Sequence, residues 1–193
     1  MYRYSVVLFA LALTAPAMAE QPSYNYLQAG YQKVEIDLGG ILGDVDGDGY
    51  QLSGSFEIGD SAYFFAGYSS ASFDFDIDAD QIEAGIGYHH GMSSNTDFYA
   101  NVAYVKAEVD VGGVGSADED GYGVAIGIRS NVSDAVELEV SVSYVDLGDD
   151  NDSTAFDGGF WFNVTDTFAL GLGFGGDDDV TTYGAGMRWY FDN

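Results

Sequence analysis

From Tyr50 to Ile58 the sequence reads Tyr-Gln-Leu-Ser-Gly-Ser-Phe-Glu-Ile, with a large apolar residue at almost every second position. Successive side chains of a β-strand point to opposite faces of the sheet. One face of this segment therefore carries Tyr50, Leu52, Phe56 and Ile58, and the other face carries only small or polar residues. The stretch predicts a strand with one strongly apolar face.

The same two-residue period recurs along the rest of the chain, and helical periodicity is nearly absent. We predict ten strands, with eight as the alternative. The ten segments span about residues 23–36, 49–59, 61–75, 80–91, 97–109, 120–130, 135–147, 154–163, 167–175 and 181–191. The alternation changes phase at Lys33-Val34-Glu35 and at Lys106-Ala107-Glu108, which predicts a register shift or bulge at each place.

Two kinds of connection alternate between these segments. Short turns fall at 59–60, 91–96, 131–134 and 163–166, and the last two are near-repeats of Asn-Val-Ser/Thr-Asp, the usual chemistry of tight turns. The other connections are rich in Asp and contain no Lys or Arg. One end of the molecule is therefore expected to be short-turned, and the other to be longer-looped and anionic.

The less apolar face of the strands identifies the class of protein. It consists largely of Gly, Ala and Ser with isolated charges, which fits the crowded inside of a small closed barrel. Large aliphatic and aromatic residues form the opposite face, with many aromatics near strand ends, as in barrels that contact lipid. We predict an all-β, closed, antiparallel, up-and-down transmembrane barrel. A secreted β-sandwich is the alternative.

Composition excludes several other classes. The chain has 193 residues, with 5 Lys+Arg against 32 Asp+Glu and a formal net charge of −27. Five cations cannot build a basic face, so nucleic acid is not an expected partner. The absence of Cys excludes disulfide scaffolds, thiolate metal sites and cysteine nucleophiles.

The first residues have the features of an export signal. Arg3 precedes an apolar run, and the segment ends at Ala17-Met18-Ala19, an A-x-A cleavage pattern. We predict a signal peptide over residues 1–19 and a barrel domain over 20–193. The apolar run is too short to cross a bilayer as a helix.

Several short motifs stand in order and resemble a known family. They are Ser23-Tyr24-Asn25-Tyr26, Gly30-Tyr31, Asp48-Gly49-Tyr50, Gly67-Tyr68-Ser69, Asp80-Gln81, Gly85-Ile86-Gly87-Tyr88, Ala103-Tyr104 and Asp120-Gly121-Tyr122. Together they resemble the small outer-membrane barrels of the diffusible-signal-factor-regulated family, within the OmpA/OmpX-like superfamily. The resemblance implies an outer-membrane location, no catalytic residues, and an association with biofilm, motility and host contact.

Charged residues on the less apolar face are the first candidate site. If that face is the lumen, it holds Glu57, Glu83, Arg129, Glu137, Glu139, Asp157 and Arg188. Buried charges need partners, so these side chains are expected to form an ion-pair network that fills the barrel. The alternative is a narrow cation-preferring path, because five acids face two bases.

A second candidate lies in the first acidic connection. Asp44-Val45-Asp46-Gly47-Asp48-Gly49 matches the first half of a calcium loop, in which alternate Asp oxygens converge on one cation. The twelfth position is Ser55 rather than Glu, so an EF-hand is excluded. Two alternatives remain for Asp44, Asp46 and Asp48: a looser Ca²⁺ site or a solvated acidic loop. No other cofactor is expected.

An enzymatic alternative rests on His89 and His90, with Ser93 and Ser94 nearby. Adjacent strand residues point to opposite faces, so one imidazole should face each way. Catalysis by Ser and His needs geometry and not closeness in sequence, and we therefore expect no enzyme.

The sequence thus predicts a non-enzymatic outer-membrane barrel with acidic extracellular loops and a structural or surface-interaction role. A narrow cation-preferring pore is the alternative. Expected partners are outer-membrane lipid and lipopolysaccharide, bridged by divalent cations. The aromatic ending Trp189-Tyr190-Phe191 resembles the signal that the barrel-assembly machinery reads.

Overall fold

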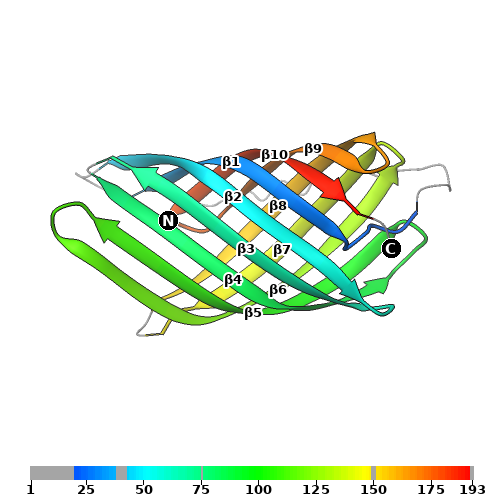
Figure 1. Ribbon diagram of the computed structural model, residues 1–193, viewed down its shortest axis with the longest axis horizontal. Helices are drawn as coiled ribbons and strands as arrows, with labels where there is room; N and C mark the ends of the chain where they lie inside the picture. The colour runs from blue at the N-terminus through cyan, green and yellow to red at the C-terminus, as the bar shows by residue number, and fades with distance from the viewer. Residues whose placement is uncertain (1–19, 38–42, 75, 149–150, 192–193) are drawn as a thin grey trace, which may run out of the picture.

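The computed structural model describes residues 20–37, 43–74, 76–148 and 151–191. They form one closed antiparallel barrel in which each strand pairs with its sequence neighbours and β1 closes against β10 (Figure 1). The strands are β1 (Tyr26–Asp37), β2 (Asp44–Ile58), β3 (Ala62–Phe73), β4 (Ile77–Gly91), β5 (Thr96–Val111), β6 (Gly115–Ser133), β7 (Val136–Asp146), β8 (Asp152–Thr165), β9 (Phe168–Gly176) and β10 (Val180–Tyr190). The ten-stranded prediction is confirmed, and the eight-stranded alternative is wrong.

The predicted signal peptide, residues 1–19, lies outside the described residues. In the part of the chain that the structure describes, no helix is long and apolar enough to span a membrane.

The two faces of the barrel wall differ as the alternation requires. Large apolar side chains point outward; Leu52, Phe64 and Leu172 are each more than half exposed. Inward positions of β9 are Ala169, Gly171 and Gly173. An apolar band of this kind is suited to lipid, while small inward residues leave room for the side chains of other strands.

Tyrosines mark the outer face at the end of the barrel that carries the acidic connections. Tyr50 and Tyr68 pack with ring centroids 5.9 Å apart, and Tyr122 and Tyr144 pack at 6.5 Å. The Tyr68 hydroxyl donates to Asp80 at 2.7 Å, and the Tyr122 hydroxyl donates to Asp146 at 3.1 Å. An amphipathic ring followed by a carboxylate is what a strand presents where it leaves the apolar layer.

Bulges at Lys33-Val34-Glu35 and Lys106-Ala107-Glu108 were expected, and both predictions are wrong. Strand pairing runs without a shift through these residues. Val34 and Val105 are buried inside the barrel, and Lys33 lies on the outer face beyond the tyrosines. The polar–apolar alternation inverts at these residues because the strand has left the apolar layer. The outward residue is therefore charged, although the backbone register does not change.

Register shifts occur instead at Asn131/Ser133 and Asn163/Thr165. These are the two near-repeated short turns, so one turn sequence carries the same irregularity twice. At the opposite end, β4, β5 and β6 have 15, 16 and 19 residues. A tilted strand needs only about 9–11 residues to cross a bilayer. Much of the acidic sequence therefore belongs to projecting hairpins rather than to loops.

Candidate functional site

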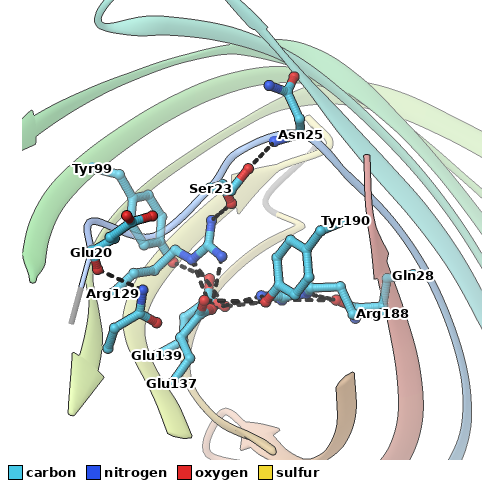
Figure 2. Close-up of polar contacts among 11 residues, drawn as sticks. Glu20, Ser23, Asn25, Gln28, Tyr99, Arg129, Glu137, Glu139, Arg188 and Tyr190 are labelled. Carbon is cyan, nitrogen blue, oxygen red and sulfur yellow. Dashed lines mark hydrogen bonds and ion pairs between the residues drawn. The ribbon is translucent and has the colours of Figure 1, made fainter. Parts of the chain in front are cut away.

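The lumen at the short-turn end holds a buried cluster of opposite charges. Arg129, Glu137 and Arg188 are 1%, 2% and 2% exposed. Glu137 Oε1 accepts from Arg129 Nη2 at 2.8 Å and from Arg188 Nη1 at 2.7 Å. Arg188 Nη2 also donates to Glu139 Oε2 at 3.3 Å. Figure 2 shows the two guanidinium groups converging on these carboxylates from opposite sides.

Neighbouring side chains add hydrogen bonds and ring stacking to this charged cluster. Tyr190 donates to Glu137 at 3.2 Å, and Tyr99 donates to Glu139 at 3.1 Å. Gln28 Oε1 accepts from Arg188 Nε and Nη2 at 3.1 and 2.9 Å. Arg188 also stacks 4.0 Å over the Trp161 ring. Two cations, two anions and their partners fill this part of the lumen, which offsets the desolvation cost of burying them.

Residues 20–25 cross the same end of the barrel ahead of β1; we call them the N-terminal strap. The strap's Ser23 carbonyl accepts from Arg129 at 3.0 Å, and its Asn25 exchanges two hydrogen bonds with Glu57, both 2.8 Å. Tyr24 stacks on Tyr63 with ring centroids 4.5 Å apart. The strap and the charged cluster together form a plug.

The two histidines point to opposite faces of β4. His89 is buried; its Nδ1 lies 3.1 Å from Asp97, its Nε2 lies 3.7 Å from Glu57, and its ring stacks on Tyr24. His90 is exposed. Ser93 bonds within its own turn to Asn95. Among the described contacts, no serine hydroxyl reaches either imidazole, so these residues do not form a Ser–His pair.

Beyond the plug, the lumen opens into a vestibule with two adjoining lobes of about 430 and 630 Å³. Amide and hydroxyl side chains line both lobes. Glu83 and Asp157 face this space, and neither forms an ion pair among the described residues. The lining continues to Ser153 and Asp177 at the acidic end, so the vestibule and the plug divide the lumen lengthwise.

The proposed calcium ligands do not form the predicted loop. Asp44, Asp46 and Asp48 lie at alternate positions on the outward face of β2, opposite Asp37, Glu35 and Lys33 of β1. An extended strand separates such carboxylates instead of converging them on one ion. In the described part of the chain, no group of three or more His, Asp or Glu side chains is arranged to hold a metal.

One carboxylate at the acidic end organises a turn. Asp177 joins β9 to β10 and accepts from Ser153 Oγ at 2.6 Å and from the amides of Asp179 and Val180 at 3.0 and 2.8 Å. Partial burial raises the pKa of Asp177, but these hydrogen bonds outweigh it and hold the pKa below its ordinary value.

All seven charged residues expected on the luminal face lie there, but in three places. Arg129, Glu137, Glu139 and Arg188 share the plug; Glu57 joins His89 and the strap; Glu83 and Asp157 face the vestibule. Sequence reasoning missed Tyr24, Asp97 and Trp161. The polar–apolar alternation places Asp97 and Trp161 on the inner face, but it cannot say which inner residues meet across the barrel.

Comparison with known sequences assigns the chain to a family. It matches the family described as "Outer membrane protein beta-barrel domain" over residues 5–191. The chain belongs to this family. This outer-membrane β-barrel protein therefore resides in the outer membrane of a Gram-negative cell, and its acidic hairpins and short turns lie on opposite sides of that membrane. Among curated protein sequences, none matches it.

Three solved structures illustrate what this outer-membrane barrel is similar to. Neisserial surface protein A is 22% identical, with a TM-score of 0.47 and coverage of 88% of this chain and 98% of that one. The translocator domain of the autotransporter NalP from Neisseria meningitidis is 11% identical (TM-score 0.52; coverage 88% and 89%). The Ail protein of Yersinia pestis, in complex with sucrose octasulfate, is 14% identical (TM-score 0.45; coverage 86% and 97%). At so low an identity, the likeness to the NalP translocator domain concerns the fold alone.

Proposed function

We propose that this chain is a non-enzymatic barrel that acts at the cell surface through its acidic hairpins, in adhesion, biofilm formation or envelope integrity. The plug is the observation that carries the proposal. Arg129, Glu137 and Arg188 fill the lumen at the short-turn end with mutually satisfied charges. A barrel closed in this way presents its hairpins as the accessible functional surface.

The partners follow from the charge of that surface. An anionic rim repels the anionic lipopolysaccharide of the outer leaflet unless divalent cations bridge the two. We therefore propose lipopolysaccharide, held through such cations, as the lateral partner, and the barrel-assembly machinery as the partner during insertion. Membership of the diffusible-signal-factor-regulated group is part of the same proposal, supported by the ordered motifs between residues 23 and 122.

A narrow cation-preferring pore is the second candidate. The vestibule supports it, because Glu83 and Asp157 face a polar cavity with no cation paired to them among the described residues. Conduction would require the plug to open, which means moving the strap or separating Arg188 from Glu137.

Planar-bilayer conductance in a KCl gradient separates the two candidates. Protein whose folding is verified by heat-modifiable gel migration should give no discrete steps if it acts at the surface. Cation-selective steps would favour the pore. In parallel, residues 109–117 of the β5–β6 hairpin are replaced by Asn-Gly, which joins the paired residues Glu108 and Asp118 through a two-residue turn. Attachment of cells that express this variant should fall, with conductance unchanged. Unaltered attachment by this and equivalent trims of the other hairpins would refute the surface role.

A further inference from the structure

We propose that the vestibule binds a small polyhydroxylated amine, of amino-sugar size, between Glu83 on β4 and Asp157 on β8. This goes beyond the proposed function, because neither surface attachment nor a closed barrel requires a solute in the lumen. The inference rests on four features of the cavity: uncompensated charge, aromatic walls, amide and hydroxyl side chains, and a bare stretch of glycine backbone.

The charge of the vestibule favours a cationic occupant. Glu83 and Asp157 line the same lobe. Both luminal guanidinium groups are engaged in the plug, and Lys106 pairs with Asp118 on the projecting hairpin. Because the three strands β5, β6 and β7 lie between β4 and β8 on the shorter way round the ring of ten, the two carboxylates approach a ligand from different walls. An ammonium group would supply the missing positive charge.

Aromatic rings line the same lobe as these carboxylates. Tyr63, Phe65 and Tyr99 contribute to its wall. The faces of aromatic rings attract cations, and this lumen already uses them: Arg129 lies 4.6 Å from the centroid of Tyr24, and Arg188 lies 4.3 Å from that of Tyr26. Carboxylates combined with aromatic walls are suited to an organic cation rather than to a metal ion.

Polar side chains on the wall add a second requirement. Gln32, Gln51 and Ser141 line the cavity and offer hydrogen-bond donors and acceptors. Hydroxyl groups on the ligand would use both kinds of group.

Glycines on the inner face of β9 and β10 leave space in the cavity for such a ligand. Gly173 and Gly184 pair directly across β9 and β10 on the inner face. A Cβ added to Gly173 would come no closer than 3.6 Å to another atom, and one added to Gly184 no closer than 3.4 Å. These two glycines are therefore not required by contact with neighbouring side chains. Their effect is to keep the adjoining lobe of about 630 Å³ open.

Isothermal titration of the refolded full-length barrel with the β-1,4-linked disaccharide of glucosamine tests the proposal. The detergent is zwitterionic, so that no sugar headgroup competes, and the ionic strength is about 0.15 M to screen the general charge of the protein. We expect saturable one-to-one binding that is at least about ten-fold tighter than binding of the N-acetylated disaccharide, which lacks the ammonium groups.

Matched variants distinguish the vestibule from the acidic surface. The double variant Glu83→Gln/Asp157→Asn should weaken binding about ten-fold or more, because each change removes a charge-assisted contact. Glu108→Gln/Asp110→Asn removes the same charge from the exposed β5–β6 hairpin and should change binding less than about two-fold. Gly184→Leu should also weaken binding, because it fills the cavity without altering charge.

Two results would overturn the proposal: no saturable binding to the wild-type barrel, or equal weakening by the vestibule and hairpin double variants. Heat-modifiable migration verifies that each variant is folded. Bilayer conductance is measured separately on the same preparations. A conducting barrel that fails to bind the amine would refute the amine site alone, while a silent barrel that binds it would support both proposals.

Discussion

The two ends of the lumen use the same kinds of residue for opposite purposes. At the short-turn end, two guanidinium groups meet two carboxylates, and every one of them has a partner within 3.3 Å. In the vestibule toward the acidic end, Glu83 and Asp157 face open space, and neither pairs with a cation among the described residues. Charge in a barrel lumen therefore stabilises the fold where it is enclosed and paired. Where it is unpaired and faces open space, it is free to interact with solutes.

The largest expected effect tests this difference with one substitution at each end. Glu137→Gln leaves Arg129 and Arg188 buried without a full countercharge, so the free energy of unfolding should fall by about 3–5 kcal/mol. Glu83→Gln removes a carboxylate that has no ionic partner in the described part of the chain, and it should leave stability unchanged or slightly higher. Urea unfolding followed by heat-modifiable migration compares the two variants. A similar loss in both would show that the vestibule carboxylates are structural as well.

Arg188 tests whether the plug closes the barrel. Arg188→Ala removes the contacts to Gln28, Glu137 and Glu139 and the stacking on Trp161. We expect a lower unfolding temperature, discrete conductance in planar bilayers, or both. Lys106→Ala is the control, because its ion pair with Asp118 is exposed and such pairs contribute about 0–1 kcal/mol. If Arg188→Ala changes neither property, then the inner-face assignment is wrong.

The fold was largely predictable because one physical period runs through the whole chain. Alternation at Tyr50–Ile58 and its repeats defined the strands, and small inward residues such as Gly171 and Gly173 distinguished a narrow barrel from a soluble sheet. The strands that project beyond the apolar layer were the main error. Outside that layer both faces are polar, so alternation no longer marks a strand, and Asp44 to Asp48 resembled a loop.

The site was only partly predictable. Alternation places Arg129, Glu137 and Glu83 on one face, but it does not say which of them meet. That depends on strand tilt and stagger, which bring β6, β7 and β10 together around Glu137. The strap was missed for another reason: Tyr24 acts from outside the ladder, through stacking and hydrogen bonds that have no sequence period.

Two luminal glycines on neighbouring strands, β9 and β10, test the difference between the two ends of the lumen through side-chain packing, without a change of charge. A Cβ on Gly171 would lie 2.3 Å from the Trp161 ring beside the plug, whereas a Cβ on Gly184 would come no closer than 3.4 Å to another atom. Gly171→Ala should therefore cost about 1–3 kcal/mol through overpacking, and Gly184→Ala should be nearly neutral. Thermal unfolding of both variants checks this. Equal tolerance would mean that Trp161 moves freely and that the plug is not tightly packed.

The smallest effect lies at the rim of the vestibule and depends on pH. Because the pKa of Asp177 is lower in the folded barrel, its contribution to stability is full above the ordinary pKa of an Asp carboxyl. That contribution is lost as the pH falls through the lower, folded value. Ser153→Ala removes the 2.6 Å hydrogen bond and should move the pKa of Asp177 upward, toward the ordinary value.

NMR titration of the Asp177 carboxyl carbon measures that shift directly. Thr182→Ser is the control. It is a small change at an inward position of β10, and Thr182 makes no described contact with Asp177. This variant should leave the pKa of Asp177 unchanged. The stability difference between wild type and Ser153→Ala should then be present at neutral pH and shrink as acid protonates Asp177 in both proteins. A difference that persists unchanged below the folded pKa would mean that Ser153 stabilises the rim by packing, and that the charge of Asp177 is not what orders the β9–β10 turn.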